Sequence, residues 1–378
     1  MTRALVALTC AFALACEEPA PVCRFGREYA LFRSETQSFH DLHTVSLGGG
    51  ALALFSDSRG VHAQRLDASG APIAPATRLF DGCDGGLDAD GDERELHLAC
   101  VRRDPRDEAS ERVSLYTLDS DLRVRSVSAF GRAGRMSHGI ALVRAGDQLA
   151  IAWHAAAMSG GRIWYFEPGR MAEPRQLSDD GWEASAPSLV RLGGRTFAAW
   201  AETRYDGERA HSRIRLSAPD ATGGAARPQT VLESRDPAPS PRLVALADGM
   251  LLSFRDKRES RRKTGLYLAR LSMQGRLVGS VVRAGRADGI ATPVLEPCLG
   301  GVVSATPRTF AGDYFVGVLR ADAELRRLSP EQQFYEDSRE FDRVAVHCAA
   351  DSALLLIAER GRLLKGNAAL RSTTFRCE

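Results

Sequence analysis

Short apolar runs recur along the chain at intervals of 45 to 54 residues, and each run ends in a polar loop. Seven copies with a period near fifty are typical of a β-propeller, in which each repeat forms one blade. The runs are ALALF (51–55), LHLAC (96–100), LAIAW (149–153), FAAW (197–200), LLSF (251–254), VVSA (302–305) and LLLI (354–357).

The fourth repeat shows how four strands fit into one period. SLVRL (188–192), the apolar run, SRIRLSA (212–218) and PQTVLES (228–234) are separated by turns rich in Gly, Asp and Pro. The second strand is nearly all apolar, which favours a place between neighbouring blades, whereas the third alternates as a half-exposed strand does. We therefore predict an all-β fold, a seven-bladed β-propeller of four-stranded antiparallel blades. The alternative is a β-sandwich or an irregular all-β pair of domains.

The segment YALFRSE (29–35) resembles the closing strands of the other repeats. We therefore expect a ring closed by strands from both termini within a single domain, residues 23–378. The expected blades are 39–82, 83–134, 135–180, 181–236, 237–287, 288–337, and 338–378 together with 23–37.

The N-terminus predicts export. A positive start, an apolar stretch from Ala4 to Ala15 and small residues before Cys16 resemble a bacterial lipoprotein signal. That resemblance implies a signal peptide over 1–15, lipidation of Cys16, and a tether over 16–22, with the protein on the cell envelope. Ala13 stands where such signals usually have Leu, and Ala-x-Ala also suits ordinary signal cleavage, so a soluble secreted protein is the alternative.

Removing Cys10 with the signal and assigning Cys16 to lipid leaves six cysteines, an even number suited to disulfides in an oxidising compartment. The repeat register pairs them. Cys83 and Cys100 lie at the adjoining ends of two antiparallel neighbours, Cys298 and Cys348 occupy the same position in adjacent inner strands, and Cys23 and Cys377 lie where the chain ends meet. The alternative is that some are buried thiols.

Composition is that of an ordinary globular protein, with 44% hydrophobic and 26% charged residues. The net charge of +2 gives no reason to expect nucleic acid as a partner. We expect a monomer that carries no cofactor and meets the membrane only through its lipid.

Two segments carry a family resemblance. GVHAQRLDASGAPI (60–73), and FAAWAETRYDGERA with APSLV before it, resemble the repeats of large secreted β-propeller proteins of bacteria, including myxobacteria. The resemblance implies a propeller and a secreted setting, and it supplies no catalytic residue to transfer.

A binding face is expected where the inter-blade loops and the loops between strands two and three emerge together. The inter-blade loops are acidic and the other loops are basic, so an acidic ring inside a basic rim is predicted; the alternative is a solvated face whose charges pair locally. One acid-x-Arg pattern, from Asp57, Asp104, Glu202 and Asp256, recurs in four blades and favours that alternative. The candidate binding residues are Asp179, Asp180, Trp182, Arg204, Tyr205, Arg258, Arg261 and Arg262.

Motifs for a metal site or a specific enzyme family match this sequence only weakly. Asp88, Asp90 and Asp92 have the spacing of a calcium loop, but the expected Gly is displaced and Ala99 replaces the bidentate carboxylate. His40 and His43 lack an identifiable third ligand, so no metal site is predicted. SDDGW (178–182) resembles a sialidase Asp-box only faintly.

Two functions are consistent with these features. The first is a non-enzymatic envelope lipoprotein that presents the propeller as an interaction platform for a protein or glycan. The second is a glycan-active hydrolase with a carboxylate pair, Asp180 and Asp236, and with Trp182 and Tyr205 as stacking surfaces. An enclosed cleft that holds a carboxyl of raised pKa would favour the hydrolase.

Overall fold

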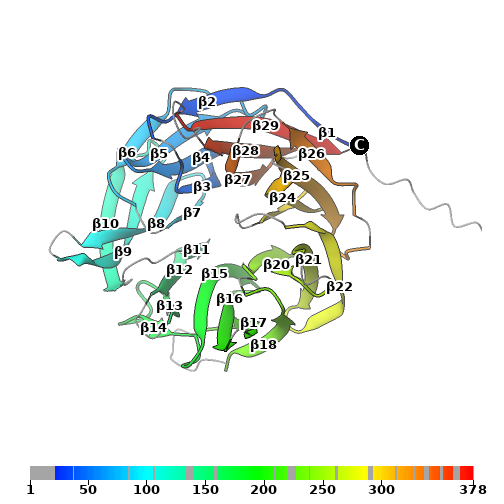
Figure 1. The fold of residues 1–378 in the computed structure, drawn as a ribbon. Helices are drawn as coiled ribbons and strands as arrows, with labels where there is room; N and C mark the ends of the chain where they lie inside the picture. Colours follow the sequence, from blue (N-terminus) through cyan, green and yellow to red (C-terminus); the bar gives the residue numbers. More distant parts are fainter. Residues whose placement is uncertain are drawn as a thin grey trace, which may run out of the picture.

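Strand follows strand in the described part of the chain, and each pairs antiparallel with its neighbours in one of seven separate sheets. The sheets stand around a common axis, so the fold is a seven-bladed β-propeller, as predicted (Figure 1). Within the residues that are described, no helix is long and apolar enough to cross a bilayer. This computed structural model describes residues 22–377 except 37, 84–85, 105–106, 133–138, 157–159, 208, 220–226, 238, 260–262, 288–292, 311–312, 327, 336–339, 350–351 and 361–366.

The first strand of each blade lines the axis, and the second strand packs outside it. The first strands are β3 (Asp41–Leu47), β7 (Leu87–Gly91), β11 (Ile140–Ala145), β15 (Glu183–Leu192), β19 (Arg242–Leu246), β23 (Val294–Cys298) and β27 (Glu340–Cys348). The second strands are β4 (Gly50–Asp57), β8 (Glu95–Asp104), β12 (Gln148–Ala155), β16 (Arg195–Asp206), β20 (Gly249–Asp256), β24 (Gly301–Phe310) and β28 (Ala353–Arg360).

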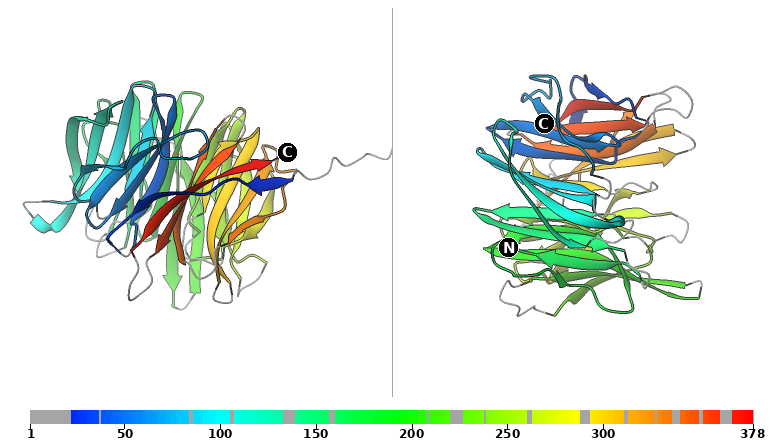
Figure 2. Two further views of the ribbon diagram at one scale, coloured as in Figure 1. Left: turned by 90° about the horizontal axis from the view of Figure 1, so that it is seen from above. Right: turned by 90° about the vertical axis from the view of Figure 1, so that its left-hand side faces the viewer.

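The third and fourth strands complete each blade toward the rim. The third strands are β5 (Gly60–Leu66), β9 (Asp107–Asp119), β13 (Arg162–Phe166), β17 (Arg209–Ser217), β21 (Gly265–Ser272), β25 (Asp313–Asp322) and β29 (Ala369–Cys377). The fourth strands of blades 1 to 6 are β6 (Thr77–Phe80), β10 (Val124–Arg132), β14 (Arg175–Gln176), β18 (Gln229–Ser234), β22 (Leu277–Arg286) and β26 (Gln332–Tyr335). Seen from the side, the strands run from one face of the disc to the other (Figure 2).

Both ends of the chain build blade 7. Its outermost position is shared by β1 (Cys23–Phe25) and β2 (Tyr29–Arg33), which both pair with β29. Cys23 lies opposite Cys377 in this pairing, and the two form a disulfide that spans 354 residues of sequence. The ring is therefore closed by hydrogen bonds and by a covalent bond between the first and last strands.

The apolar core is divided among the interfaces between blades. The buried apolar residues that are described form seven clusters, and each cluster joins two adjacent blades. Trp153 packs between blades 2 and 3, and Trp200 packs between blades 3 and 4. Since every second strand contributes to the clusters on both of its sides, the apolar run that recurs in the sequence is explained.

The third strands are more buried than the alternation in their sequences suggests. In β5 and β21 all but one or two side chains are buried, including polar ones such as Gln64. In β13, by contrast, buried and partly exposed side chains alternate as predicted. The prediction of a half-exposed third strand is wrong for β5 and β21, because the neighbouring blades cover both of their faces. The exposed positions lie instead on fourth strands such as β22.

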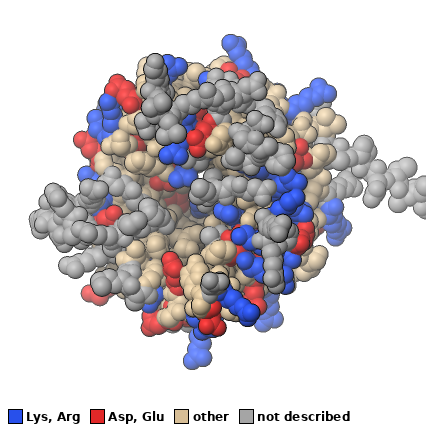
Figure 3. All heavy atoms as spheres, in the orientation of Figure 1, with Lys and Arg blue, Asp and Glu red and all other residues tan. Residues whose placement is uncertain are grey.

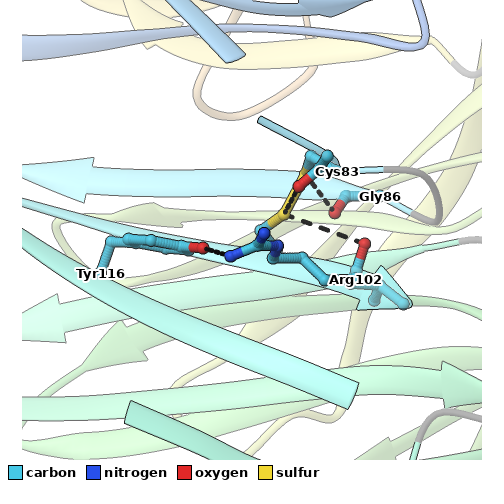
Figure 4. The surroundings of a disulfide bond; sticks show 7 residues. Cys83, Gly86, Arg102 and Tyr116 are labelled. Carbon is cyan, nitrogen blue, oxygen red and sulfur yellow. Dashed lines mark hydrogen bonds between the residues drawn. A yellow bond between two sulfur atoms is a disulfide. The ribbon is translucent and has the colours of Figure 1, made fainter. Parts of the chain in front are cut away.

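The other two disulfides join the pairs expected from the register, Cys83 with Cys100 and Cys298 with Cys348. Beside Cys83–Cys100, the guanidinium of Arg102 donates a hydrogen bond to the hydroxyl of Tyr116 (Figure 4). The Tyr116 ring in turn stacks on Phe80, with 3.9 Å between ring centroids. Arg102 was expected on a basic loop; it lies within β8 and is part of the support of blade 2.

Candidate functional site

The seven first strands surround a central channel with a volume of about 1000 Å³. Figure 3 shows the corresponding hollow in the middle of the ring, with acidic and basic side chains at its margin. The lining begins where the inter-blade connections enter the first strands, at residues such as Ser38, Gly86, Gly139 and Ser240, and it extends inward along those strands. Its size is that of a cavity for a small molecule or a short oligomer.

The channel wall is chemically asymmetric. Blades 3 and 4 contribute small and apolar side chains, including Ile140, Ala186, Pro187 and Leu189. The other blades contribute nearly all of the charge, namely Asp41 and His43 from β3, Asp88 and Asp90 from β7, Arg242 from β19, Glu296 from β23, and Arg343 and His347 from β27. A ligand in this channel therefore meets hydrogen-bonding groups on one side and an apolar surface on the other.

His43 and Asp88 form a pair between blades 1 and 2. Their Nδ1 and Oδ1 atoms are 3.2 Å apart, and the other carboxylate oxygen of Asp88 accepts the backbone N–H of Leu142 at 2.7 Å. Burial alone would lower the pKa of His43, but the hydrogen bond and charge of Asp88, together with Asp41, raise it above its ordinary value. The positive charge of Arg242 acts on the same ring from blade 5, on another side of the channel.

Glu296 is the least satisfied of the channel acids. No hydrogen bond from the described residues reaches its carboxyl group. Burial, and then the negative charge of Asp90, raise the pKa of Glu296 to about 7. Burial also raises the pKa of Asp90, although its carboxylate accepts the backbone N–H of Arg144 at 2.7 Å. Near neutral pH the channel therefore holds a carboxyl group that exchanges its proton readily and that has no hydrogen-bond partner among the described residues.

The charges from blades 1 and 7 lie on the same side of the channel. Burial raises the pKa of Asp41, although the positive charges of His43 and Arg343 oppose that shift. The Nε of Arg343 donates to the backbone oxygen of His40 at 3.1 Å. Burial lowers the pKa of His347, so that ring is neutral near pH 7. This side of the channel therefore offers both hydrogen-bond donors and acceptors.

Two strained residues line the channel, one in blade 4 and one at the start of blade 5. Ala186 and Ser240 have φ angles of 50° and 46°, in the left-handed region that non-glycine residues seldom adopt. In blades 2 and 3 the corresponding starts of the first strands are Gly86 and Gly139, which also have positive φ. Such strain is held by surrounding structure and is found preferentially at functional sites. Backbone shape, as well as side chains, therefore forms the channel mouth.

The sequence placed the binding residues on the loop face, and the structure brings five of them together. Asp179, Asp180, Trp182, Arg204 and Tyr205 all lie at the boundary of blades 3 and 4. The guanidinium carbons of Arg204 and Arg213 lie 5.1 and 3.9 Å from the centroid of the Trp182 ring. Tyr205 is 58% exposed, so an aromatic surface is available at this edge.

The three basic residues from blade 5 are placed differently. Arg258 does not stand free in solvent: its Nε donates to Asp256 at 2.7 Å, and its guanidinium covers the rings of Phe254 and Tyr267. Arg261 and Arg262 lie outside the described residues. The pairing of Arg258 with Asp256 agrees with the alternative of a loop face whose charges pair locally.

The acids of the inter-blade loops are paired locally. Asp84 and Asp288, and the side chain of Asp342, lie outside the described part of the chain. The others form ion pairs with nearby arginines, which are Asp81 with Arg78, Asp179 with Arg213 and Arg215, Asp180 with Arg162, Asp236 with Arg255, and Glu340 with Arg360. This arrangement agrees with the interpretation of local pairing and leaves no continuous acidic ring among these residues.

Asp180 and Asp236 lie in unlike surroundings. Asp180 has a side chain that is 90% exposed, whereas Asp236 is buried and accepts a hydrogen bond from Thr264 at 3.2 Å. Neither residue lines the channel. Nothing in this arrangement places them on the two sides of one enclosed cleft, as hydrolysis of a glycosidic bond requires.

Buried acids recur at one position, two residues after the end of the apolar run. They are Asp57, Glu202, Asp256 and Glu359. Three of them bind the connection that arrives from the previous blade: Asp57 accepts from Ser34 Oγ at 2.6 Å, Glu202 from the Asp179 N–H at 3.0 Å, and Asp256 from the Arg235 N–H at 2.9 Å. Asp104 was expected in this set; Arg102 occupies that position in β8, and Glu359 is the fourth member.

The residues of the suspected calcium loop have structural partners. Asp88 and Asp90 bind backbone N–H groups of β11, and Asp92 accepts N–H groups of its own turn from Arg94 and Glu95. In the described part of the chain, no three His, Cys, Asp or Glu side chains are grouped so that they could hold a metal ion.

Comparison with known proteins adds the fold and no closer relationship. No protein-family model and no curated protein matches the chain. Among solved structures, a puromycin hydrolase S511A mutant complexed with PGG is 15% identical over 86% of this chain and 50% of its own, with a TM-score of 0.52. The chain thus spans half the length of that hydrolase.

Two other structures cover most of both chains. The AfRom2 CNH domain is 12% identical over 92% of this chain and 98% of its own, with a TM-score of 0.51. The polysaccharide lyase Uly1 is 11% identical over 86% and 87%, with a TM-score of 0.49. What the puromycin hydrolase and the AfRom2 CNH domain share with the chain is the fold. At such identities the likeness concerns the fold alone, and function has to be argued from the channel and its surroundings.

Proposed function

We propose that the protein is a lipid-anchored envelope protein that binds a hydroxyl-rich ligand, such as an oligosaccharide, in its central channel without chemical conversion. The observation that carries this proposal is Glu296, a half-buried carboxyl group that faces the channel and receives no hydrogen bond from the described residues. Buried polar groups normally have partners, and one that lacks a partner inside a cavity is suited to a ligand.

The remaining wall supports a sugar-like ligand. His43, Arg242 and Arg343 can donate hydrogen bonds, and Asp41, Asp88 and Asp90 can accept them. The apolar wall from blades 3 and 4 suits the C–H face of a sugar ring. A protein partner would need a wider surface than a channel of about 1000 Å³ provides, and the exposed edge around Trp182 and Tyr205 is where such a partner could dock.

Glu296→Gln is expected to weaken binding of an oligosaccharide about 10- to 100-fold. This is the range expected for the loss of a hydrogen bond to a charged group. Wild-type affinity should rise as the pH rises through about 7, the raised pKa of Glu296, because only the ionised carboxylate accepts the strong hydrogen bond from a sugar hydroxyl that Gln cannot replace. Isothermal titration with neutral, amino and uronic tetrasaccharides measures both effects.

Asp180→Asn is the matched control, since Asp180 is an exposed acid outside the channel and should leave affinity unchanged. Equal binding by wild type and Glu296→Gln at every pH would remove Glu296 from the site. Release of shorter sugars by the wild type but not by Glu296→Gln would instead favour the second candidate, a glycan hydrolase. One observation favours that candidate: Glu296 with its raised pKa interacts with a second carboxylate, Asp90, as an acid and base pair in hydrolysis would.

The anchor is tested separately. Cys16→Ser is expected to move the protein from the membrane fraction to the soluble fraction, because lipid chains on one cysteine contribute about 0.8 kcal/mol per buried methylene group. The three disulfides support folding in an oxidising compartment. Fractionation of cells that express each form is the measurement, and a Cys16→Ser protein that stays with the membrane would contradict the lipid anchor.

A further inference from the structure

A groove of about 310 Å³ lies on the rim of the propeller, outside the channel. Its walls are β1, the segment up to Tyr29, the end of β29, and Ser69 in the loop between β5 and β6 of blade 1. It therefore lies between the outer strands of blades 7 and 1. The lining residues are Val22, Arg24, Phe25, Gly26, Arg27, Tyr29, Ser69, Thr374 and Arg376.

Two arginines lie side by side in this groove. Arg24 and Arg376 are direct cross-strand partners in the β1–β29 pair. Their neighbours Cys23 and Phe375 are buried in the core between blades 6 and 7, so alternation along the strands turns both arginines away from that core. Like charges at opposed positions of a strand pair repel each other. An arrangement of this kind is stabilised when an anion lies between the two guanidinium groups.

A third cation and two hydroxyl groups complete the groove. The guanidinium of Arg27 lies over the Tyr29 ring at 5.2 Å, and Ser69 Oγ lies 3.4 Å from the Tyr29 hydroxyl. Among the described residues, no acid forms an ion pair with Arg24, Arg27 or Arg376. Groups of this kind, guanidiniums with hydroxyl donors, bind phosphate oxygens with several hydrogen bonds at once.

Two acids near the groove have partners elsewhere, whereas Glu378 lies outside the described residues. Asp67 accepts the backbone N–H groups of Ser69 and Ala71 in its own turn, at 2.8 and 2.9 Å. Glu28 is paired with Arg371. Among the described residues, the groove therefore keeps a net positive charge that no nearby acid neutralises.

We infer that this groove binds the phosphate groups of anionic lipids at the membrane to which the protein is anchored. The inference rests on the proposed lipid anchor for its choice of ligand. Val22 is 58% exposed at the edge of the groove and follows Cys16 by six residues, which span at most about 20 Å when extended. A lipid on Cys16 thus holds the groove close to the headgroups, and the propeller lies on the membrane by this rim.

The groove can be tested without the lipid. A chain that begins at Glu17 lacks the lipidated cysteine but keeps every described strand and all three disulfides. It also keeps Glu17 and Glu18, so any repulsion between these two acids and an anionic membrane acts in the test as well. We expect it to co-sediment with phosphatidylcholine vesicles that contain phosphatidylglycerol and not with phosphatidylcholine alone. Each arginine near an anionic surface strengthens binding about fivefold, so Arg24→Ala, Arg27→Ala and Arg376→Ala together should weaken binding about 100-fold.

The matched control removes the same charge from the far side of the ring. Arg195→Ala, Arg209→Ala and Arg276→Ala change three exposed arginines in blades 4 and 5 and should leave vesicle binding nearly unchanged. Melting temperatures should be similar for both triple variants, because the first removes a repulsive pair and the second alters only surface residues.

Two results would overturn the inference. Equal weakening by both triple variants would show that net charge alone attracts the protein. Calorimetric binding of inorganic phosphate to the wild-type chain, lost in the first triple variant and without vesicle binding, would show that the groove takes a soluble phosphate. Neither result depends on Cys16, so failure here leaves the lipid anchor to be judged by fractionation.

Discussion

Replacing Cys23 and Cys377 with serine is expected to lower the free energy of unfolding by about 5 kcal/mol. The disulfide closes a loop of 354 residues, so its removal restores a large chain entropy to the unfolded state. It also frees β1, a strand of only three residues, from the covalent bond that holds it beside β29. Guanidinium denaturation, with and without the substitutions, gives the difference from the shift of the midpoint.

The matched comparison is the double substitution of Cys83 and Cys100. That bond spans 17 residues, so the same chain-entropy relation assigns it about 3 kcal/mol. A smaller loss for Cys23 and Cys377 than for Cys83 and Cys100 would contradict the view that closing the ring is the main contribution of the first bond.

Glu202→Ala is expected to destabilise the protein by about 4 kcal/mol. Glu202 is fully buried, and its carboxylate accepts hydrogen bonds from Trp200 Nε1 at 2.9 Å and from Arg213 Nε at 2.8 Å. It also holds the N–H of Asp179, where the chain enters blade 4. Removal of one partner from a buried charge network leaves the others desolvated without compensation, which is the costly case.

Two control variants separate charge from position. Glu202→Gln keeps the shape of the side chain but loses the charge, so it should fall between wild type and Glu202→Ala. Asp180→Ala removes an exposed acid from the same loop and should change stability by less than about 1 kcal/mol, as surface ion pairs usually do. Thermal or denaturant unfolding measures all three, and equal losses for Asp180→Ala and Glu202→Ala would contradict the network.

The fold was predictable because its determinant repeats. Each second strand is covered on both sides by other blades, so the sequence must place an apolar run there in every repeat. The cysteine pairs followed from the same register, since Cys298 and Cys348 end equivalent strands and therefore lie side by side. Burial of the third strands was underestimated because their polar residues, such as Gln64, are buried against neighbouring blades rather than exposed.

The channel could not be predicted in the same way. Asp41 and Arg242 begin first strands and Glu296 lies in the middle of one, but no residue type repeats at these positions, so no periodic signal marks them. Their convergence depends on how the ring closes around the axis. Charged residues in the short first strands were the available signal. The cluster of arginines in blade 5 is a stronger signal in the sequence, but Arg258 in that cluster neutralises the buried Asp256 two residues earlier.

The bond between Cys23 and Cys377 also makes the order of events during biosynthesis matter. Cys23 emerges early and its partner emerges last, and Cys83 is the first retained cysteine to follow Cys23. An oxidant that acts as the chain appears therefore meets the wrong neighbour long before the right one. Faithful maturation of this ring requires either a delay in oxidation until the final strand is made or a catalyst that exchanges mispaired thiols.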